Sequence, residues 1–267
     1  MDGNSVKLNN GVEMPRIGYG VYLIPPGMTE RCVREALSVG YRSIDTAQCY
    51  YNEREVGTAV RNSGLSRHEV FITTKLWGGA GYRDTVSSID ASLSRLDLDY
   101  IDLLLMHEPT GDVPEIYRAM EDAFRAGKVR AIGVANFLDD MYQRLVKQME
   151  IVPAVNQVET HVFRQQKPLR SLMNSYGTQP EAWSPLAAGQ NGFFSQPLLM
   201  EIAREHGKSV AQIGLRFLYQ QGIIVIPKST HVERMKENKE IEDFCLSEED
   251  MKRIETLDRG KSLFNWW

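Results

Sequence analysis

The sequence predicts a closed (β/α)8 TIM barrel preceded by a short β-hairpin. The chain has 267 residues, close to the roughly 250 residues of a typical barrel of this kind. Short apolar runs that scarcely alternate recur along it, as in strands buried on both faces, and helical patterns separate these runs. Because no linker or change of composition interrupts this rhythm, we expect residues 1–267 to form a single domain and the sheet to close.

The first predicted element is the hairpin, at about residues 5–15, where apolar and polar residues alternate around Asn10-Gly11. Eight strands are predicted after it, at residues 16–20, 41–45, 70–75, 101–107, 131–136, 154–159, 178–183 and 222–227. Helices are predicted at residues 29–39, from about 52, and at 83–96, 113–126, 139–149, 168–176, 197–205, 210–221 and 232–242. The helix at 29–39 is expected to begin with a Thr29 cap.

The composition argues against several kinds of function. A net charge of -4 provides no basic surface for nucleic acid or a membrane. Cys32, Cys49 and Cys245 are widely spaced and odd in number, which favours neither a disulfide framework nor a thiolate metal site. Neither a signal-peptide pattern nor an apolar run of about 18 residues occurs, so a cytoplasmic location is expected. Because GxGxxG, P-loop and metal-spaced histidine motifs are missing too, we expect no metal and an unusual mode of nucleotide binding, if any.

Three titratable residues end predicted strands, where a barrel places its active site. They are Asp45, Lys75 and His107, and Tyr50 lies in the loop that follows Asp45. Each residue alone has an ordinary structural explanation, as a turn residue, a solvated charge, a bonded core histidine or a packing aromatic ring. Their placement around one rim is what points to chemistry.

Together the four residues predict an acid that protonates an oxyanion. A free phenol has a pKa near 10, and an ammonium group about 4 Å away is expected to lower that value by one to three units. Asp45 is expected to keep Lys75 charged and oriented, while His107 fixes the substrate oxygen from the other side.

Seven stretches occur in the order found in one enzyme family. They are GYRSIDTAQCYYNEREVG, FITTKLW, DLLLMHEP, VRAIGVANF, PAVNQVE, EAWSPL and IPKSTHVERMKEN. On these motifs the chain resembles the aldo-keto reductase superfamily over nearly its whole length, most closely small bacterial members of the diketogluconate reductase and glyoxal reductase type. The resemblance implies that Tyr50 is the general acid, that Lys75 and Asp45 tune it, and that His107 either orients the substrate or relays a proton. It also implies hydride transfer from NADPH to an aldehyde or ketone, including dicarbonyls and keto sugars, without a metal.

The resemblance assigns cofactor contacts as well. Asn136 and Gln157 match the residues that bond the nicotinamide carboxamide, and Trp183 matches the ring that stacks on the nicotinamide. The other matches are Ser184 and Leu186 along the pyrophosphate, Lys228, Ser229 and Arg234 at the adenosine 2′-phosphate, and Glu237 and Asn238 at the adenine. Two cations and a hydroxyl near a helix start suit a dianionic phosphate, so NADPH is expected in preference to NADH.

The predicted substrate contacts are Tyr22, Trp77, His107 and Glu108. Tyr22 and Trp77 are expected to form an aromatic wall for the substrate, and Trp266 and Trp267 are expected either to extend this aromatic wall or to pack across the barrel.

Four features depart from the family pattern. Ala135 stands where Ser is common, which removes a hydroxyl and is expected to weaken cofactor binding. Tyr51 replaces the usual Gly and Glu108 the usual Trp, and both changes are expected to alter the substrate range. Residues 187–194 also differ from the common sequence, near the cofactor.

Two other functions remain open at this point. A barrel lyase could use Lys75 to form a Schiff base, and a cofactor-binding regulatory subunit could use the same fold with little turnover. The small-molecule carbonyl reductase is favoured because the four rim residues and the cofactor motifs occur together. A monomer is expected, since no exposed apolar helix stripe calls for a partner chain.

Overall fold

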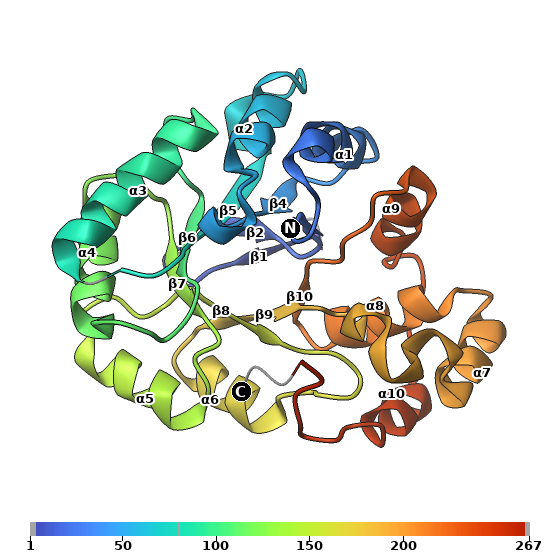
Figure 1. Cartoon of the computed structure of the whole chain (residues 1–267). Helices are drawn as coiled ribbons and strands as arrows, with labels where there is room; N and C mark the ends of the chain where they lie inside the picture. The colour runs from blue at the N-terminus through green and yellow to red at the C-terminus, as the bar shows by residue number, and fades with distance from the viewer. Residues whose placement is uncertain (1–3, 80, 265–267) are drawn as a thin grey trace.

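The computed structural model describes residues 4–79 and 81–264, and it confirms the barrel (Figure 1). Eight parallel strands form one sheet in the order β3 to β10. They are β3 (Tyr19–Gly20), β4 (Ser43–Asp45), β5 (Phe71–Leu76), β6 (Leu103–Met106), β7 (Ile132–Ala135), β8 (Val155–Glu159), β9 (Gln179–Trp183) and β10 (Ile224–Val225). A parallel bridge between Ile17 and Val225 joins the two ends of the sheet. The Gly20 N–H donates to the Pro227 carbonyl at 3.1 Å beside it, so the barrel is closed.

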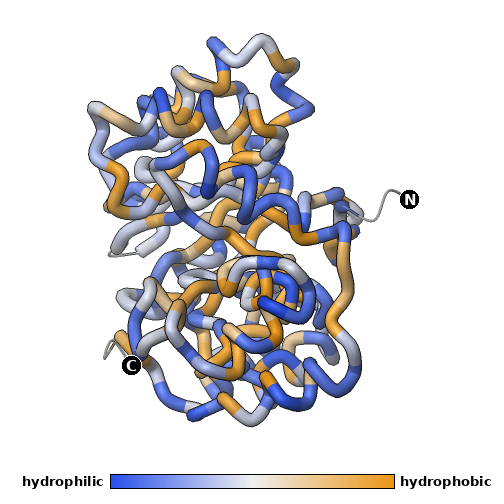
Figure 2. Tube along the Cα trace, turned by 90° about the vertical axis from the view of Figure 1, so that its right-hand side faces the viewer, coloured by the Kyte–Doolittle hydropathy of each residue, from blue (hydrophilic) through white to orange (hydrophobic). Residues whose placement is uncertain are grey.

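Helices surround these strands. They are α1 (Pro26–Ser38), α2 (Glu53–Arg61), α3 (Tyr82–Leu96), α4 (Val113–Arg125), α5 (Asp139–Gln148), α6 (Lys167–Ser175), α7 (Pro197–His206), α8 (Val210–Gln220), α9 (Val232–Lys239) and α10 (Glu248–Glu255). Hydrophilic and hydrophobic positions alternate along many of them (Figure 2), because one face of each helix packs on the barrel. Three short 3-10 helices, η1 (Gln48–Tyr50), η2 (Arg67–Glu69) and η3 (Ala187–Ser195), complete the helical elements of the described residues. None of the helices in these ranges has the length and apolar composition needed to cross a bilayer.

One helix start differs from the sequence prediction by more than one residue, and one helix was not predicted. Helix α1 begins at Pro26 rather than at a Thr29 cap, because proline suits the first helical position, where no N–H is needed. The Thr29 hydroxyl instead donates to the Pro25 carbonyl at 3.1 Å. Helix α10 was not predicted at all, although Ser247 and Asp250 form a capping box at its start.

The predicted hairpin is present as β1 (Ser5–Lys7) paired with β2 (Glu13–Pro15). It closes the end of the barrel opposite the carboxyl ends of the strands. Leu8 and Met14 from the hairpin pack with Phe71, Leu103 and Ile224 in a buried cluster inside the barrel. This apolar cluster fills the hairpin end of the barrel, and the titratable residues Asp45 and Lys75 lie at the other end of their strands.

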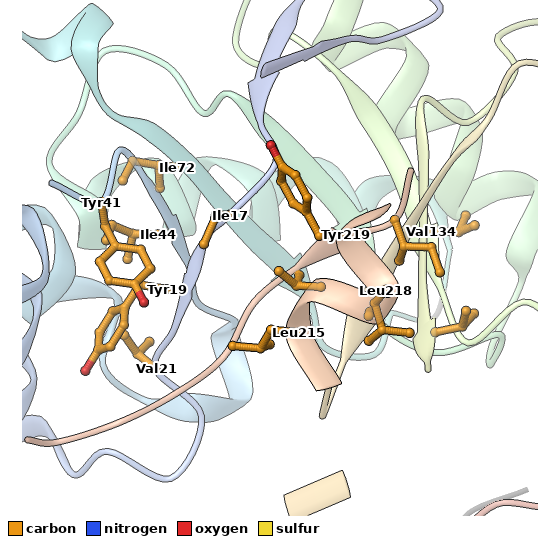
Figure 3. Packing of buried hydrophobic residues seen from close by; sticks show 14 of the residues in the cluster. Ile17, Tyr19, Val21, Tyr41, Ile44, Ile72, Val134, Leu215, Leu218 and Tyr219 are labelled. Atoms are coloured by element: carbon orange, nitrogen blue, oxygen red, sulfur yellow. The ribbon is translucent and has the colours of Figure 1, made fainter. Parts of the chain in front are cut away.

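The larger part of the core lies between the strands and the helices (Figure 3). The rings of Tyr19 and Tyr41 pack 5.5 Å apart in this layer, and the Tyr41 hydroxyl donates to the Met235 carbonyl of α9 at 3.0 Å. A Cβ atom at Gly57 in α2 would lie 1.8 Å from the Leu96 carbonyl oxygen of α3. Glycine is therefore required where these two helices meet, directly behind the loop that carries Tyr50.

Candidate active site

Four side chains converge at the carboxyl ends of neighbouring strands. Asp45 ends β4, Lys75 lies near the end of β5, His107 follows β6, and Tyr50 ends η1. The Lys75 ammonium lies 2.5 Å from Asp45 Oδ1 and 3.3 Å from the Tyr50 hydroxyl, and it donates to the Thr46 carbonyl at 3.1 Å. The Lys75 side chain has no solvent exposure. A buried cation with three oxygen acceptors thus holds the phenol and the carboxylate together.

The loop that carries Tyr50 is fixed by a buried asparagine. Asn52 accepts a hydrogen bond from the Thr46 hydroxyl at 2.7 Å and donates to the Val21 and Ile24 carbonyls, at 3.2 Å each. Because these contacts join the loops after β3 and β4, the position of Tyr50 does not depend on local turn geometry alone.

The charges in the site act on the phenol in opposite directions. Burial by itself would lower the pKa of Lys75, but the attraction of Asp45 outweighs it and raises that pKa above the usual value. Burial raises the pKa of Tyr50 above its usual value, and Lys75 offsets only part of that rise. The net lowering expected from the sequence is therefore wrong for the protein alone, because Asp45 neutralises much of the lysine charge and the phenol is buried.

The His107 imidazole is neutral. Burial and the nearby Lys75 ammonium lower its pKa to about 3. Its ring lies 5.8 Å from the ring of Tyr50 and 5.2 Å from that of Trp77, edge to face in both cases. A neutral imidazole in this place can donate one hydrogen bond to a substrate oxygen without carrying a charge.

Three residues predicted to hold the nicotinamide lie beside one another. The Trp183 indole N–H donates to Asn136 Oδ1 at 2.8 Å, and the Asn136 amide N–H₂ donates to Glu108 Oε1 at 3.1 Å and to the His107 carbonyl at 3.2 Å. Gln157 Nε2 donates to Asp45 Oδ2 at 2.9 Å. The predicted carboxamide site is therefore connected to the predicted proton-donating site through Asp45 and His107.

Glu181 was missed from the sequence. It is fully buried in β9 and accepts a hydrogen bond from Gln157 Nε2 at 2.9 Å, the same nitrogen that donates to Asp45. Burial and the charge of Asp45 raise the pKa of Glu181 well above its usual value. The position two residues before Trp183 was a usable signal, since alternate residues of a strand share a face.

These residues fit a nicotinamide carboxamide in part. Both hydrogens of Gln157 Nε2 and both of Asn136 Nδ2 are donated to protein oxygens. The two side chains therefore offer acceptor oxygens, which suit the N–H₂ group of a carboxamide. Ala135, buried at the end of β7, has no hydroxyl to donate to the carboxamide oxygen. Whether cofactor binding is weakened by Ala135 stays a prediction.

The residues predicted at the phosphates lie after β10, the strand that pairs with β9, and in α9. Lys228 and Arg234 are exposed, and neither forms an ion pair with a residue that the structure describes. Ser229 is buried, and its hydroxyl accepts a hydrogen bond from the His231 N–H at 3.1 Å. Two free cations next to a helix start are able to bind a phosphate dianion.

The other predicted cofactor residues differ in exposure. Glu237 is partly buried and Asn238 is buried, both in α9. Ser184 and Leu186 are partly buried in the segment after β9. Ser184, Ala187 and Ala188 have left-handed backbone conformations there, and the last two are the first residues of η3, so the chain turns sharply where η3 begins. This turning is the structural counterpart of the unusual sequence at residues 187–194.

Comparison with known proteins identifies the family of this chain. The aldo/keto reductase family model matches residues 23–259. The chain is a member of the aldo/keto reductase family. The resemblance inferred from the seven motifs is thereby confirmed.

Several named reductases are similar to this chain over almost their whole length. The chain is 46% identical to the glyoxal reductase of Bacillus subtilis over 261 residues, which cover 97% of this chain and 94% of the relative. It is 40% identical to the methylglyoxal reductase DkgA of Escherichia coli, with the same coverage. Among solved structures, MGS-M4, an aldo-keto reductase enzyme from a Medee basin deep-sea metagenome library, is 44% identical, covers 97% of both chains and superposes with a TM-score of 0.95.

In this aldo/keto reductase, aromatic residues flank the four site residues. The Tyr22 ring packs 5.0 Å from the Tyr50 ring and is 46% exposed. Trp77 is 54% exposed next to His107. A partly exposed aromatic ring on each side of the phenol and imidazole leaves apolar surface for a substrate. Trp266 and Trp267 lie outside the described residues.

The two departures beside the mouth have different environments. Tyr51 is 81% exposed and has a left-handed backbone, with φ of 57°, a conformation that favours glycine. Glu108 is partly buried, and burial raises its pKa to about 7 although the Asn136 hydrogen bond lowers it. Tyr51 is therefore a surface residue of the aldo/keto reductase, whereas Glu108 is bonded to the predicted carboxamide site.

A cavity of about 400 Å³ lies on the outer side of η1. Its lining includes Cys49, Tyr51 and Trp77 together with Arg54 and Glu55. The cavity adjoins the aromatic wall and does not contain the four site residues. Residues 4–79 and 81–264 hold no cluster of three or more histidine, cysteine or acidic side chains arranged to bind a metal.

Proposed function

We propose that this protein reduces aldehydes or ketones, including dicarbonyls or keto sugars, to alcohols with NADPH as the hydride donor. The observation that carries the proposal is the Lys75 ammonium, fully buried between Asp45 at 2.5 Å and the Tyr50 hydroxyl at 3.3 Å, with neutral His107 beside the phenol. Such an arrangement suits the donation of a proton to an alkoxide. The glyoxal and methylglyoxal reductases among its relatives support small carbonyl compounds as the substrate class.

The phenol of Tyr50 acts as the general acid. Its raised pKa keeps the hydroxyl protonated near neutral pH, so the proton is available when the carbonyl oxygen becomes negative. The Lys75 charge then stabilises the phenolate that remains, and Asp45 keeps that charge in place. His107 donates a hydrogen bond to the same oxygen and thereby orients the carbonyl. The bound reduced nicotinamide supplies the hydride.

Asn136, Gln157 and Trp183 are proposed to hold the nicotinamide ring. Lys228, Ser229 and Arg234 are proposed to hold the 2′-phosphate, because the two cations lack ion-pair partners in the described part of the chain. This favours NADPH over NADH. Ser184, Leu186, Glu237 and Asn238 are proposed as further cofactor contacts. We also propose that the protein is a monomer of one domain and is located in the cytoplasm.

The competing functions have less support. A Schiff base at Lys75 requires a substrate carbonyl to reach an amine that has no solvent exposure and is bonded to Asp45. A regulatory subunit with little turnover has no need of an intact acid, cation and carboxylate in contact. Both alternatives make different experimental predictions from the reductase.

The first experiment measures NADPH oxidation by the purified protein with methylglyoxal, a nitrobenzaldehyde, a sugar aldehyde and a diketo sugar acid, with NADH as the comparison. Turnover with NADPH and little with NADH is expected. Binding of NADPH without turnover of any carbonyl would favour the regulatory subunit, and failure to bind NADPH would remove the reductase proposal.

The role of Tyr50 is tested with Tyr50→Phe, which removes only the hydroxyl. Turnover is expected to fall by about 100-fold or more, while the dissociation constant for NADPH stays within about 2-fold, since the phenol is not a proposed cofactor contact. Tyr82→Phe in α3 is the matched control, because its hydroxyl bonds Asp122 away from the site. Near-normal turnover of Tyr50→Phe would exclude the phenol as the acid.

The phosphate site is tested with Lys228→Ala and Arg234→Ala. Each is expected to raise the NADPH dissociation constant by about 10-fold or more and to leave that of NADH unchanged. Lys236→Ala provides the control, because it removes a similar exposed charge from α9, the helix that carries Arg234. Equal loss of NADPH affinity in all three variants would point to general electrostatic attraction instead of a site.

A further inference from the structure

The thiol of Cys49 contacts the imidazole of His107. Cys49 precedes Tyr50 in η1, and its Sγ lies 3.5 Å from His107 Nδ1. The contact joins the loop after β4 to the loop after β6, across the rim that carries the phenol. It is the only hydrogen bond of the His107 ring nitrogens within the described residues.

The protonation states of both groups are defined by their surroundings. Burial raises the pKa of the Cys49 thiol to about 11, so the sulfur carries a hydrogen near neutral pH. His107 is neutral, because burial and Lys75 lower its pKa to about 3. A neutral imidazole has one nitrogen that donates and one that accepts.

The direction of the hydrogen bond follows from these states. An imidazole nitrogen accepts well, whereas a thiol sulfur accepts poorly. The favoured arrangement therefore has the Cys49 S–H donating to Nδ1, which leaves the ring hydrogen on Nε2. In the opposite arrangement Nδ1–H faces the sulfur and Nε2 is an acceptor, which cannot bond a carbonyl oxygen.

We propose that Cys49 is a positioning residue that holds His107 in the tautomer with its hydrogen on Nε2, so that the imidazole donates to the substrate carbonyl oxygen. The proposal deepens the carbonyl reductase function and rests on it. Cys49 does not touch the substrate in this role. It determines which ring nitrogen can donate.

Other contacts keep the imidazole from turning. The rings of Tyr50 and Trp77 meet the His107 ring at interplanar angles of 78° and 72°. A 180° flip about the Cβ–Cγ bond, which would exchange Nδ1 with Cδ2 and take Nδ1 away from the thiol, would have to pass between these neighbours. The rings of Tyr50 and Trp77 fix the plane of the imidazole, and the thiol of Cys49 selects its tautomer.

The position of the thiol is fixed from the opposite side. Gln48 donates to the hydroxyls of Ser88 and Ser92 in α3, at 2.8 Å each. Its Oε1 accepts from the Trp77 N–H at 2.9 Å. One side chain therefore ties η1 both to the helix behind it and to the backbone of the aromatic wall, so Cys49 has little freedom to move away from His107.

The tautomer can be measured without cofactor or substrate. Protein with nitrogen-15-labelled histidine contains five imidazoles, and comparison with a His107→Gln variant assigns the signals of His107 in a two-bond nitrogen–proton correlation spectrum. The wild-type protein is expected to show hydrogen on Nε2. Cys49→Val, which keeps the approximate size but cannot donate, is expected to show a mixture, and Cys49→Ser is expected to restore the Nε2–H form at least in part.

Kinetics provide the second measurement. The kcat/KM of Cys49→Val is expected to fall by about 3- to 10-fold, in keeping with the loss of one hydrogen bond, and Cys49→Ser is expected to recover part of it. Cys245→Ser, at an exposed cysteine away from the site, is expected to change neither the spectrum nor the rate. Thermal melting confirms that each variant is folded, and Cys49→Ala takes the place of Cys49→Val if valine prevents folding.

Two results overturn the proposal: hydrogen on Nδ1 in the wild-type protein, or the same tautomer composition in wild type and Cys49→Val. The failure of the underlying function is distinguishable from these. If no carbonyl is reduced by wild-type protein, the reductase proposal fails and the role of Cys49 in catalysis fails with it, whereas the spectrum still reports whether the thiol sets the tautomer.

Discussion

The buried ion pair between Lys75 and Asp45 allows a strong test of how this site is stabilised. Lys75→Met keeps a long unbranched side chain but removes the charge and the three hydrogen bonds to Asp45, Thr46 and Tyr50. The Asp45 carboxylate is then left in a site where it is almost inaccessible to water. Among the residues that the structure describes, its remaining side-chain partner is the Gln157 amide.

The expected loss is large compared with the stability of a domain. Breaking a buried ion pair by removing one partner costs about 3 to 5 kcal/mol, while a domain is stable by about 5 to 15 kcal/mol. Lys75→Met is therefore expected to fold near neutral pH with about 3 to 5 kcal/mol less stability. Replacing both partners, as Lys75→Met with Asp45→Asn, is expected to recover part of this loss because no unpaired charge remains.

Urea unfolding followed by tryptophan fluorescence measures the free energies. Lys128→Met is the control, because the Lys128–Asp90 pair has the same 2.5 Å separation but lies on the surface. An exposed pair contributes about 0 to 1 kcal/mol. The ion pair is not the origin of the stability if Lys75→Met lowers the free energy of unfolding by no more than Lys128→Met does. The same conclusion follows if Asp45→Asn lowers the free energy of unfolding by the same amount in Lys75→Met as in the wild-type protein.

Three further predictions concern single residues. Burial raises the pKa of Glu108 to about 7, so the folded state holds a proton that the unfolded chain has lost above about pH 4.3, and stability falls as the pH rises to 7. Glu108→Gln is therefore expected to gain about 1 to 3 kcal/mol relative to wild type between about pH 5 and pH 8 in urea unfolding, and an unchanged difference would contradict the shift. Glu159 behaves in the opposite way: burial would raise its pKa, but hydrogen bonds, including one from the Leu263 N–H, lower it to about 2. Its contribution is present above about pH 4.3 and is lost as the pH falls towards 2, so Glu159→Gln is expected to be less stable than wild type near pH 7 and equally stable near pH 2. Tyr51→Gly relieves a left-handed backbone at an exposed position and is expected to stabilise the protein by up to about 1 kcal/mol, whereas Tyr51→Ala is expected to give no gain in the same assay.

Much of the fold was predictable because it follows from local patterns. Strands buried on both faces are short apolar runs, and the helices between them repeat every 3.6 residues, so all eight strands of the barrel were found. The rim residues Asp45, Lys75 and His107 followed from the same rule, since they end such runs. Helix α10 was missed because its sequence, EEDMKRIE, buries only Asp250 and Ile254 and has almost no apolar face.

The direction of the Tyr50 pKa could not be predicted in the same way. The sequence places a cation near the phenol, but it does not say how deeply the phenol is buried or how much of the lysine charge is neutralised. Both depend on packing between distant segments. Burial raises the pKa and Asp45 adds to that effect, and together they exceed the influence of Lys75.

Glu181 is a second feature that was not predicted from the sequence. It shares the Gln157 amide with Asp45, and so lies between the proposed carboxamide site and the proposed acid. Gln157 Nε2 lies 2.9 Å from a carboxylate oxygen of Asp45 and 2.9 Å from one of Glu181, and the other oxygen of Glu181 has no hydrogen-bond partner among the described residues. Asp45 thus divides its oxygens between Lys75, which tunes the proposed acid, and Gln157, which is proposed to bind the carboxamide. A shift of the Gln157 amide towards a ligand must weaken a bond to Asp45 or to Glu181, and a weaker bond to Asp45 leaves that carboxylate more dependent on Lys75. Binding at the proposed carboxamide site would therefore be coupled, through one buried carboxylate, to the charge next to Tyr50.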